Sequence, residues 1–486
     1  MIAASQPILS CAEARGVESR IFGGDEAKEW PAMQRAGRAV ATAVVRDFGE
    51  IGGFPANGRV LVLVGKGHNG GDALLAAQAV LAEFPRARAD VWFFFGERAL
   101  RPLAARAWRE LVHAMGARVG RVEGPAGGYD LCLDGVFGFQ FRAPAEEGVA
   151  VGLDRVNAWP IRLRAAVDLP SAGRFRADFT YATGSVKQPV VGAPEAGRVR
   201  YLDLGFFGGD EPGAARVLTP AVLAPLAALR EAQSDKRTYG HVFVVGGSRS
   251  YPGAVLMTVL AALRGGAGLV TAFVPESLVA AFAARAPEAM WVGWPETPEG
   301  GLALEGQHLL AARIARASAL VIGPGLGREK ETLALVRDLV GTATVPLVID
   351  ADALQPDIVA AGRAPRVLTP HAGEYARIAE AVGANAVLVR KGPVTRVSGG
   401  AGAETYHSFF GGPVLARGGS GDVLAGLIGA QLGQTPGDPL LAAARGVVWH
   451  GLAADALARA HGQTAVQTTQ VLDFLGGALR ESVHEQ

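Results

Sequence analysis

The stretch Pro413-Val-Leu-Ala-Arg417-Gly418-Gly419-Ser420-Gly421-Asp422-Val423-Leu424-Ala425-Gly426 joins a glycine-rich turn to an apolar pattern of helical spacing. Glycine tolerates positive φ and allows close approach to the backbone, and the following apolar residues recur as in a helix. The free N–H groups and dipole at a helix start favour an anion. Asp422 would repel a phosphate as a ligand, but it is well placed to deprotonate an attacking hydroxyl. The alternative is a tight turn with Asp422 as a helix N-cap.

Length and composition limit the classes of protein to which this chain can belong. A chain of 486 residues predicts two or three domains, and 49% hydrophobic residues suffice for large cores. A net charge of +1 gives no reason to expect nucleic acid or an anionic membrane as partner. No apolar run approaches the about 18 residues of a membrane span, and the N-terminus lacks the pattern of a signal peptide. Cys11 and Cys132 form neither a disulfide framework nor a zinc cluster. We therefore expect a cytoplasmic protein.

The N-terminal half predicts alternating strands and helices. Residues 7–48 are expected to be helical, in the segments 8–21 and 33–48. The continuous apolar run 59–64 is typical of a strand buried on both faces. It leads into a glycine-rich loop, 65–73, and a helix, 74–84, which makes a phosphate or dinucleotide site plausible. The pattern repeats with a strand at 90–95 and a helix at 99–115.

Oxygen-bearing side chains follow several of these strands. Asn69, Asp134, Asp168 and Ser171 stand at predicted carboxyl ends, the edge where open α/β sheets bind ligands. Each Asp taken alone is also compatible with a helix cap. Together these oxygens, without Cys or His, suit a hard cation.

The sequence resembles the NAD(P)H-hydrate epimerase (YjeF N-terminal) family in three motifs, at residues 64–72, 134–142 and 167–171. The resemblance covers about residues 7–215, with departures at His68, Ala73 and the segment after Ser171. It implies that Asn69, Asp134 and Ser171 bind potassium, and that Asp168 is the acid/base for inversion at the hydrated ring carbon. The residues that it implies for binding the hydrated dinucleotide are His68, Asn69, Gly70, Gly71, Asp72, Gly138, Phe139, Gln140, Phe141, Arg142, Ala143, Pro144 and Asp168.

The C-terminal half repeats the α/β pattern after a turn-rich joint. Buried strands are expected at 240–245, 268–274, 319–322, 346–349, 366–368 and 386–389. Their polar or glycine-rich ends predict one mostly parallel sheet with a single ligand edge. Taken singly, Gly323-Pro-Gly325 is compatible with a turn, His371 with a loop residue, and Asp350 and Asp352 with caps.

The order of these motifs resembles the ribokinase-like fold and, within it, the NAD(P)H-hydrate dehydratase (YjeF C-terminal) family. The segments that carry the resemblance are 246–254, 369–374 and 418–422, within about residues 236–480. It implies that Ala254, Gly325, His371 and Asp422 contact the hydrate, with Asp422 as the catalytic base. Arg417 stands where the family often has Thr. The residues implied for the nucleotide are Lys391, Gly392, Pro393, Val394, Thr395, Gly418, Gly419, Ser420 and Gly421.

The two resemblances imply a repair enzyme for hydrated NADH and NADPH. One half would interconvert the R and S epimers, and the other would dehydrate the S form with ADP as co-substrate, giving AMP and phosphate. K⁺ is implied for the epimerase and Mg²⁺ for the dehydratase. We expect a Rossmann-like α/β/α domain at 1–215, a linker helix at 216–235 and a ribokinase-like α/β/α domain at 236–486, in a homo-oligomer.

Two alternatives remain. The C-terminal half resembles ribokinase-like kinases of vitamin precursors, which leave a stable phosphorylated alcohol. The N-terminal half also resembles non-catalytic scaffold domains of mRNA decapping proteins. The presence of Asp134, Asp168 and Ser171 favours catalysis over a scaffold role.

Overall fold

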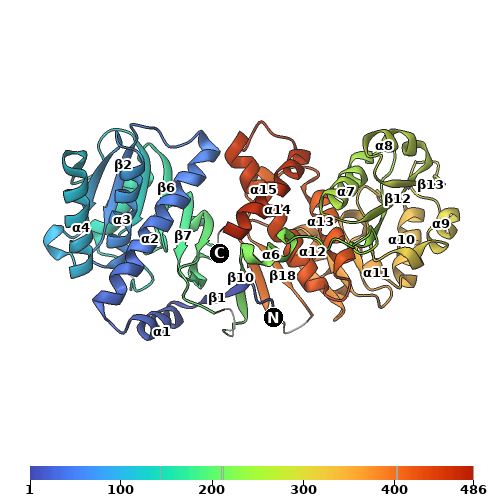
Figure 1. Cartoon of the computed structure of the whole chain (residues 1–486), viewed down its shortest axis with the longest axis horizontal. Helices are drawn as coiled ribbons and strands as arrows, with labels where there is room; N and C mark the ends of the chain where they lie inside the picture. Colours follow the sequence, from blue (N-terminus) through green and yellow to red (C-terminus); the bar gives the residue numbers. More distant parts are fainter. Residues whose placement is uncertain (143, 209–210, 212, 401–402, 485–486) are drawn as a thin grey trace. The chain divides into compact units, whose positions relative to one another are not determined.

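The computed structural model describes residues 1–142, 144–208, 211, 213–400 and 403–484. The chain divides into two compact units, which Figure 1 colours along the sequence. The N-terminal unit comprises Gln6–Val217 and Ala458–Gly462, and the C-terminal unit comprises Met1–Ser5, Leu218–Leu457 and Gln463–Gln486.

A parallel sheet with the order β4-β3-β2-β5-β6-β7-β9 forms the centre of the N-terminal unit. From β2 the chain proceeds to β3 and β4 on one side, and β5 then starts the other side. This reversal creates a switch point between the carboxyl ends of β2 and β5. The strands are β2 (Arg59–Val64), β3 (Arg88–Phe93), β4 (Val119–Arg121), β5 (Tyr129–Gly135), β6 (Ile161–Val167), β7 (Phe179–Thr183) and β9 (Arg198–Leu202).

Helices cover both faces of this sheet, because side chains along a strand point alternately to its two faces. Val60, Val62 and Val64 pack in one core cluster with α2 (Glu26–Asp47), α3 (His68–Glu83) and α4 (Pro102–Met115). Leu61 and Leu63 pack in a second cluster with α5 (Glu147–Asn157). The unit is therefore the α/β/α sandwich that the sequence predicts.

The prediction of one helix over residues 8–21 was wrong at its start. Residues 5–9 form β1 (Ser5–Leu9), in which Ile8 and Leu9 pair in parallel with Val186 and Lys187 of β8 (Val186–Lys187). Helix α1 (Cys11–Phe22) follows, and its N-cap Ser10 forms a capping box with Glu13. The pairing partner lies almost 180 residues away, so the local apolar pattern did not reveal the strand.

The loop expected at 65–73 is shorter than predicted, because α3 begins at His68. Its first turn contains two glycines for packing reasons. A Cβ on Gly70 would lie 2.5 Å from the Gly65 carbonyl oxygen, and one on Gly71 would meet the Met33 methyl group. His68, Asn69 and Asp72 are thus carried by a helix rather than by a loop.

In the C-terminal unit, β13-β12-β11-β14-β15-β16-β17 are parallel, and β18 and β19 continue the sheet antiparallel. The order reverses between β11 and β14, which is the switch point of this sheet. The strands are β11 (His241–Val245), β12 (Leu269–Pro275), β13 (Met290–Trp294), β14 (Ala319–Ile322), β15 (Leu347–Ile349), β16 (Arg366–Leu368), β17 (Ala386–Arg390), β18 (Thr395–Ser398) and β19 (Thr405–Ser408).

Helices also cover both faces of the second sheet. A core cluster on one face includes Phe243, Ile322 and Ile349 together with residues of α9 (Gln307–Ala311), α10 (Lys330–Thr342), α11 (Pro356–Val359) and α12 (Ala372–Ile378). On the other face, α13 (Ser420–Gln434) approaches the sheet so closely that a Cβ on Gly429 would meet Val321. The remaining helices are α7 (Pro252–Arg264), α8 (Val279–Arg285), α14 (Pro439–His461) and α15 (Val471–His484).

The segment 216–235 is not one linker helix. It begins in β10 (Ala215–Leu218), and its only α-helical part among the described residues is the single turn α6 (Ala224–Ala227). Pro220 and Pro225 lie in this segment, and prolines lack the N–H that a helix interior requires. Its Ala- and Leu-rich composition therefore misled the prediction.

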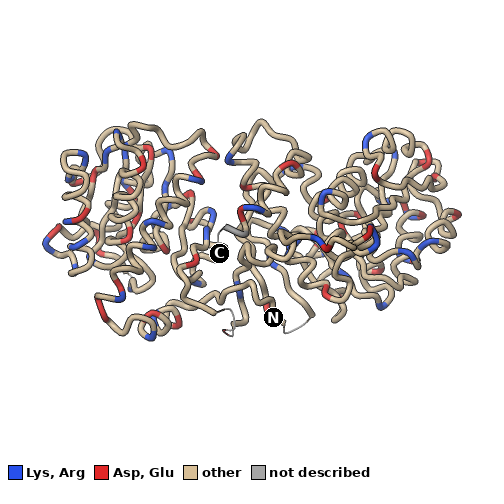
Figure 2. The backbone as a smooth tube through the Cα atoms, viewed as in Figure 1, with Lys and Arg blue, Asp and Glu red and all other residues tan. Residues whose placement is uncertain are grey.

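Charge is distributed evenly along the chain. Figure 2 shows basic and acidic residues interspersed along the tube in both units, in keeping with the net charge of +1. Across the described residues, no helix has the length and apolar character needed to cross a membrane.

Candidate functional site

The switch point of the N-terminal unit opens into a cavity of about 650 Å³. Gly65 follows β2 and its N–H donates to the Gly135 carbonyl at the end of β5, 3.1 Å away. A Cβ on Gly135 would lie 2.5 Å from the Asn69 carbonyl oxygen. Glycine is thus required here so that the two strand ends and α3 can approach one another, with the cavity beside them.

Most of the residues predicted to bind the dinucleotide line this cavity. They are His68, Asn69, Asp72, Gly138, Phe139, Gln140, Phe141, Arg142, Pro144 and Asp168. Gly70 and Gly71 are buried residues of the first turn of α3 and do not belong to the cavity lining. Ala143 lies outside the described residues.

Asp168 is held in a strained conformation beside a buried cation. Its φ is 67°, in the left-handed region that non-glycine residues rarely adopt. Its carboxylate pairs with the Lys187 ammonium, and both side chains are almost fully buried, at 6% and 1% exposed. Buried strain of this kind clusters at functional sites. The pair lies at the cavity wall, because both residues belong to the cavity lining.

Lys187 was missed by the sequence reasoning. It lies in β8, which is only two residues long, and its ammonium also donates to the Thr183 carbonyl at 3.0 Å. The only signal was a lysine within the short segment Val186-Lys-Gln-Pro-Val190. Lysine side chains are usually exposed. The sequence therefore did not indicate that Lys187 is buried beside Asp168.

The predicted potassium ligands lie together. The Ser171 hydroxyl donates to Asp134 Oδ1 at 2.6 Å, and the Ser171 N–H donates to Asp134 Oδ2 at 2.8 Å. The Asn69 amide donates to the Phe137 carbonyl at 2.8 Å, and the Phe137 N–H donates to Ser171 Oγ at 2.8 Å. Burial raises the pKa of Asp134 to about 6, although its hydrogen bonds from Ser171 oppose this. A cation near this fully buried carboxyl would offset that burial cost.

Aromatic rings and one ion pair complete the cavity wall. Phe137 packs against Phe141 with ring centroids 4.3 Å apart, and the Lys66 ammonium lies 4.1 Å from the centroid of Phe95. His68, whose role the sequence left open, lies 3.4 Å from the Glu29 carboxylate. The wall therefore offers flat apolar surfaces together with charged groups, as a dinucleotide requires.

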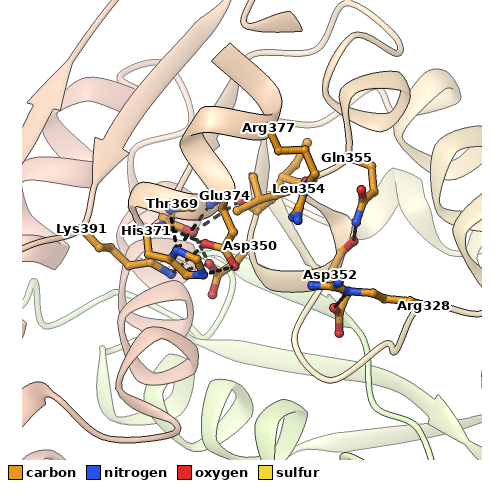
Figure 3. A network of polar contacts seen from close by, with 12 residues as sticks. Arg328, Asp350, Asp352, Leu354, Gln355, Thr369, His371, Glu374, Arg377 and Lys391 are labelled. Carbon is orange, nitrogen blue, oxygen red and sulfur yellow. Dashed lines mark hydrogen bonds and ion pairs between the residues drawn. The ribbon is translucent and has the colours of Figure 1, made fainter. Parts of the chain in front are cut away.

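In the C-terminal unit, three strand ends meet around Asp350. This residue follows β15 and is 1% exposed. Its Oδ1 accepts a hydrogen bond from the Thr369 hydroxyl at 2.7 Å and from the Lys391 ammonium at 2.9 Å. Figure 3 shows these contacts beside the separate pair of Asp352 with Arg328. From the sequence, Asp350 was compatible with a helix cap. In the structure, its carboxylate pairs with the Lys391 ammonium.

His371 lies next to this cluster, at the N-cap of α12. Its Nδ1 accepts from the Gly373 N–H at 3.0 Å, and the Glu374 carboxylate accepts from the His371 N–H at 2.8 Å. Glu374 also lies 4.0 Å from the Lys391 ammonium. The exposed ring of His371 is thus fixed at the helix start, with its Nε2 3.4 Å from the Glu374 carboxylate.

The start of α13 brings the opening motif to the same edge. Gly419 is the N-cap, with a φ of 90°. A Cβ on Gly421 would lie 3.1 Å from the Lys391 ammonium and 3.7 Å from Asp350 Oδ2. Lys391 therefore reaches the first turn of α13, which also carries Asp422.

Asp422 is shifted toward its neutral form. Burial and the neighbouring Asp350 raise its pKa to about 7, and Lys391 partly opposes this. A carboxylate with a pKa near neutral can both accept and release a proton under working conditions, which is the property of a general base. The arrangement thus combines a base, an ammonium and the amide-rich start of a helix.

Ala254 and Gly325, both predicted to contact the hydrate, lie side by side. A Cβ on Gly325 would lie 3.1 Å from the Ala254 Cβ. The Thr258 hydroxyl lies 3.1 Å from both the Ala254 and the Asp422 carbonyl oxygens, which ties α7 to the start of α13. The structure therefore gathers these residues near Asp422.

The remaining nucleotide-binding predictions occupy the same region. Lys391 follows β17, and Gly392 and Pro393 are exposed before β18 starts at Thr395. Arg417, which the sequence could not explain, donates to the carbonyls of Gln463 and Thr464 at 2.6 and 2.7 Å. These contacts give Arg417 a structural role in holding the turn before α13.

Comparisons with known proteins found relatives of both units. A family model described as NAD(P)H-hydrate dehydratase matches residues 242–475. A second, described as YjeF-related protein N-terminus, matches residues 31–192. A solved ADP/ATP-dependent NAD(P)H-hydrate dehydratase from Bacillus subtilis, co-crystallised with ATP and Mg²⁺, is 26% identical, with a TM-score of 0.47 over 55% of this chain and 98% of that chain.

Two full-length relatives are similar across both units. The bifunctional NAD(P)H-hydrate repair enzyme Nnr of Moorella thermoacetica is 34% identical over 93% of each chain. Its counterpart from Gloeobacter violaceus is 36% identical over 93% of this chain and 94% of that protein. The chain therefore belongs to the family of bifunctional NAD(P)H-hydrate repair enzymes.

Proposed function

We propose that this protein repairs NADH and NADPH hydrated at ring carbon 6. The N-terminal unit interconverts the R and S epimers, and the C-terminal unit dehydrates the S epimer with ADP, giving NAD(P)H, AMP and phosphate. The similarity to bifunctional repair enzymes over both units supports this proposal. The observation that carries the chemistry is the convergence of Asp422, Lys391 and the start of α13.

The dehydration needs help because hydroxide is a poor leaving group. Asp422 takes the proton of the substrate hydroxyl as its oxygen attacks the terminal phosphoryl group of ADP. The N–H groups at the start of α13 and the Lys391 ammonium stabilise the charge on that group. Phosphate then departs from the ring carbon, driven by the lone pair of the ring nitrogen, and loss of the C5 proton leaves the reduced nicotinamide.

Mg²⁺ would neutralise the charge of the bound nucleotide. Among the described residues, no group of three or more His, Cys, Asp or Glu side chains is placed to hold a metal ion. Mg²⁺ commonly binds through one or two carboxylates and substrate phosphates. Asp350, the acidic residue beside Lys391 at this edge, fits that mode together with the phosphates of ADP.

In the N-terminal unit, Asp168 is the proposed acid/base for inversion, with Lys187 as its ion-pair partner. The loop from Gly138 and the first turn of α3 hold the dinucleotide in the cavity. K⁺ would be held by oxygens of Asn69, Asp134 and Ser171, whose mutual contacts and buried carboxyl fit a cation. Its role there would be to fix the Phe137 loop against α3.

The decisive experiment measures recovery of reduced nicotinamide absorbance. Purified protein is incubated with S-hydrate and ADP, with ATP and no nucleotide in parallel arms. We expect recovery with ADP, accompanied by AMP and phosphate. With R-hydrate, we expect recovery faster than spontaneous epimerisation allows. Failure to recover, with a stable phosphorylated alcohol formed from another substrate, would instead support a small-molecule kinase.

Two expectations from the sequence remain proposals: location in the cytoplasm and assembly into a homo-oligomer. Light scattering coupled to size-exclusion chromatography measures the assembly directly, and a mass equal to one chain would contradict it.

A further inference from the structure

Residues 6–22 precede the segment 31–192 that the N-terminal family model matches, yet they reach the epimerase cavity. The register of β1 on β8 places Leu9 opposite Lys187. Ser10 then caps α1, so the helix begins directly after the residues of β1 that pair with β8. The charges of Asp168 and Lys187 both act on Cys11, the first residue of α1. This N-terminal segment is therefore anchored beside the Asp168–Lys187 pair.

One face of α1 is directed into the cavity. Its lining residues are Arg15, Glu18, Ser19 and Phe22. Their spacing of three and four residues is that of a single helical face. Of these, Glu18 is the one whose side chain can exchange a proton near neutral pH. Burial raises the pKa of Glu18 to about 7, with Lys187 opposing and Asp168 and Glu29 adding to the rise.

Charged groups from several elements face Glu18 across the cavity. Those that line it are Arg15 on α1, Glu29 on α2, Lys66, His68 and Asp72 at the start of α3, Arg101, Arg142, Glu146, Asp168 and Lys187. Asp72 is an alternative proton donor, because its Oδ1 is buried without a hydrogen-bond partner. Burial, Asp168 and Glu18 raise the pKa of Asp72 well above its usual value. Its surroundings thus favour the neutral form of Asp72.

We propose that Glu18 is a catalytic residue of the epimerase, donating a proton to the departing hydroxyl while Asp168 serves as the base. This inference rests on the proposed function of the N-terminal unit. Two carboxyl groups in one cavity have different surroundings, since Asp168 has a buried cation as ion-pair partner, whereas Glu18 has no ion-pair partner among the residues that the structure describes. Pairs separated in this way are typical of acid and base assignments.

The step balances without another reactant. Glu18 gives its proton to the hydroxyl on carbon 6, the carbon–oxygen bond breaks, and water leaves as the ring-nitrogen lone pair forms an iminium bond. Water then adds to the opposite face of carbon 6, and Asp168 takes the released proton. Proton return from Asp168 to Glu18, through water in their shared cavity, restores the site. No proton is consumed overall.

The test compares Glu18→Gln with the native enzyme in R-to-S conversion across pH. Because the donor must be protonated, the native rate should fall as pH rises past about 7. Glu18→Gln should lower kcat by about 100-fold or more at pH 7 and abolish that alkaline fall, with a small change in KM. Arg20→Gln is the matched control, because Arg20 is exposed on the same helix and does not line the cavity.

Each result is decisive. Dehydration of S-hydrate by Glu18→Gln, together with an unchanged melting temperature, verifies that the variant is folded. A Glu18→Gln variant with the native rate and pH profile overturns the assignment, as does one whose lower rate retains the alkaline fall. If the native protein does not accelerate epimerisation at all, the proposed function of this unit fails instead.

Discussion

At the scale of single residues, Asp422 meets two opposing demands. As the proposed base it must be charged to accept a proton, yet burial and Asp350 favour its neutral form. An ordinary aspartate pKa of 3.8 is raised here to about 7. The unfolded chain therefore loses this proton before the folded unit does, and folding stability falls as pH rises between about 4 and 7.

Replacing Asp422 with Asn separates these demands. We expect dehydration to slow on the order of 10²- to 10⁴-fold, since a general base contributes about that much. The variant should gain stability relative to the native protein as pH rises from about 4 to 7, because Asn carries no charge to bury. Coupled absorbance assays and thermal unfolding at several pH values measure both effects. Equal stability differences at pH 4 and pH 8 would contradict the pKa assignment.

Asp350 supports Lys391 from a fully buried position, so Asp350→Asn should be costly. Removing one partner of a buried ion pair destabilises by about 3 kcal/mol or more. Urea unfolding measures this loss, and an accompanying rise in KM for ADP would show that Lys391 has lost its position. Arg328→Gln is the control, because Arg328 pairs with Asp352 at the surface, 69% exposed, where such pairs contribute at most about 1 kcal/mol. Equal losses in both variants would contradict the argument.

The sequence identified carboxylates at strand ends but not the cations that pair with them. Asp168 and Asp422 stand beside local motifs, so their positions could be read directly. Lys187 is 19 residues from Asp168, and Lys391 is 41 residues from Asp350. Whether two such residues meet depends on strand order, which no local pattern contains.

At the scale of elements, the start of α13 depends on one glycine. Gly419 has a φ of 90°, and a Cβ there would lie 2.5 Å from the Met257 methyl carbon. We expect Gly419→Ala to destabilise the C-terminal unit by about 1–3 kcal/mol, since a non-glycine residue is strained in this region. Denaturant unfolding followed by circular dichroism measures the change.

Gly418→Ala is the matched control for this prediction. A Cβ on Gly418 would meet no atom within 4 Å, and its φ is not positive. Its stability should stay within about 0.5 kcal/mol of the native value, as at most surface positions. If the two alanine variants unfold alike, backbone conformation is not what requires glycine at Gly419.

Strands buried on both faces were predictable, and the pair β1 and β8 was not. The apolar runs of β2, β11 and β14 contain their own signal, because a strand covered by helices needs hydrophobic residues on both faces. In contrast, β1 and β8 are short and become strands by pairing with each other. The early start of α3 likewise depends in part on Gly71, which packs against the distant Met33.

At the scale of the whole molecule, each unit has its own sheet, core and site. We therefore expect Asp168→Ala to impair only epimerisation and Asp422→Asn to slow only dehydration. A mixture of the two variants should convert R-hydrate to NADH with ADP, because the S epimer made by one protein can diffuse to the other. Absorbance recovery in the mixture is compared with each variant alone. A mixture no faster than Asp168→Ala alone would show that both sites must act within one chain.

The sequence by itself determined the α/β class of both units, the glycine-rich turns at their switch points and the carboxylates beside them. These features are local, since a buried strand, a tight turn and a helix start each impose their residues within a few positions. Only the tertiary structure decided which charges meet. It placed Lys187 against Asp168, Lys391 between Asp350 and the first turn of α13, and Glu18 in the epimerase cavity. Those positions follow from strand pairing between distant segments, which no local pattern specifies.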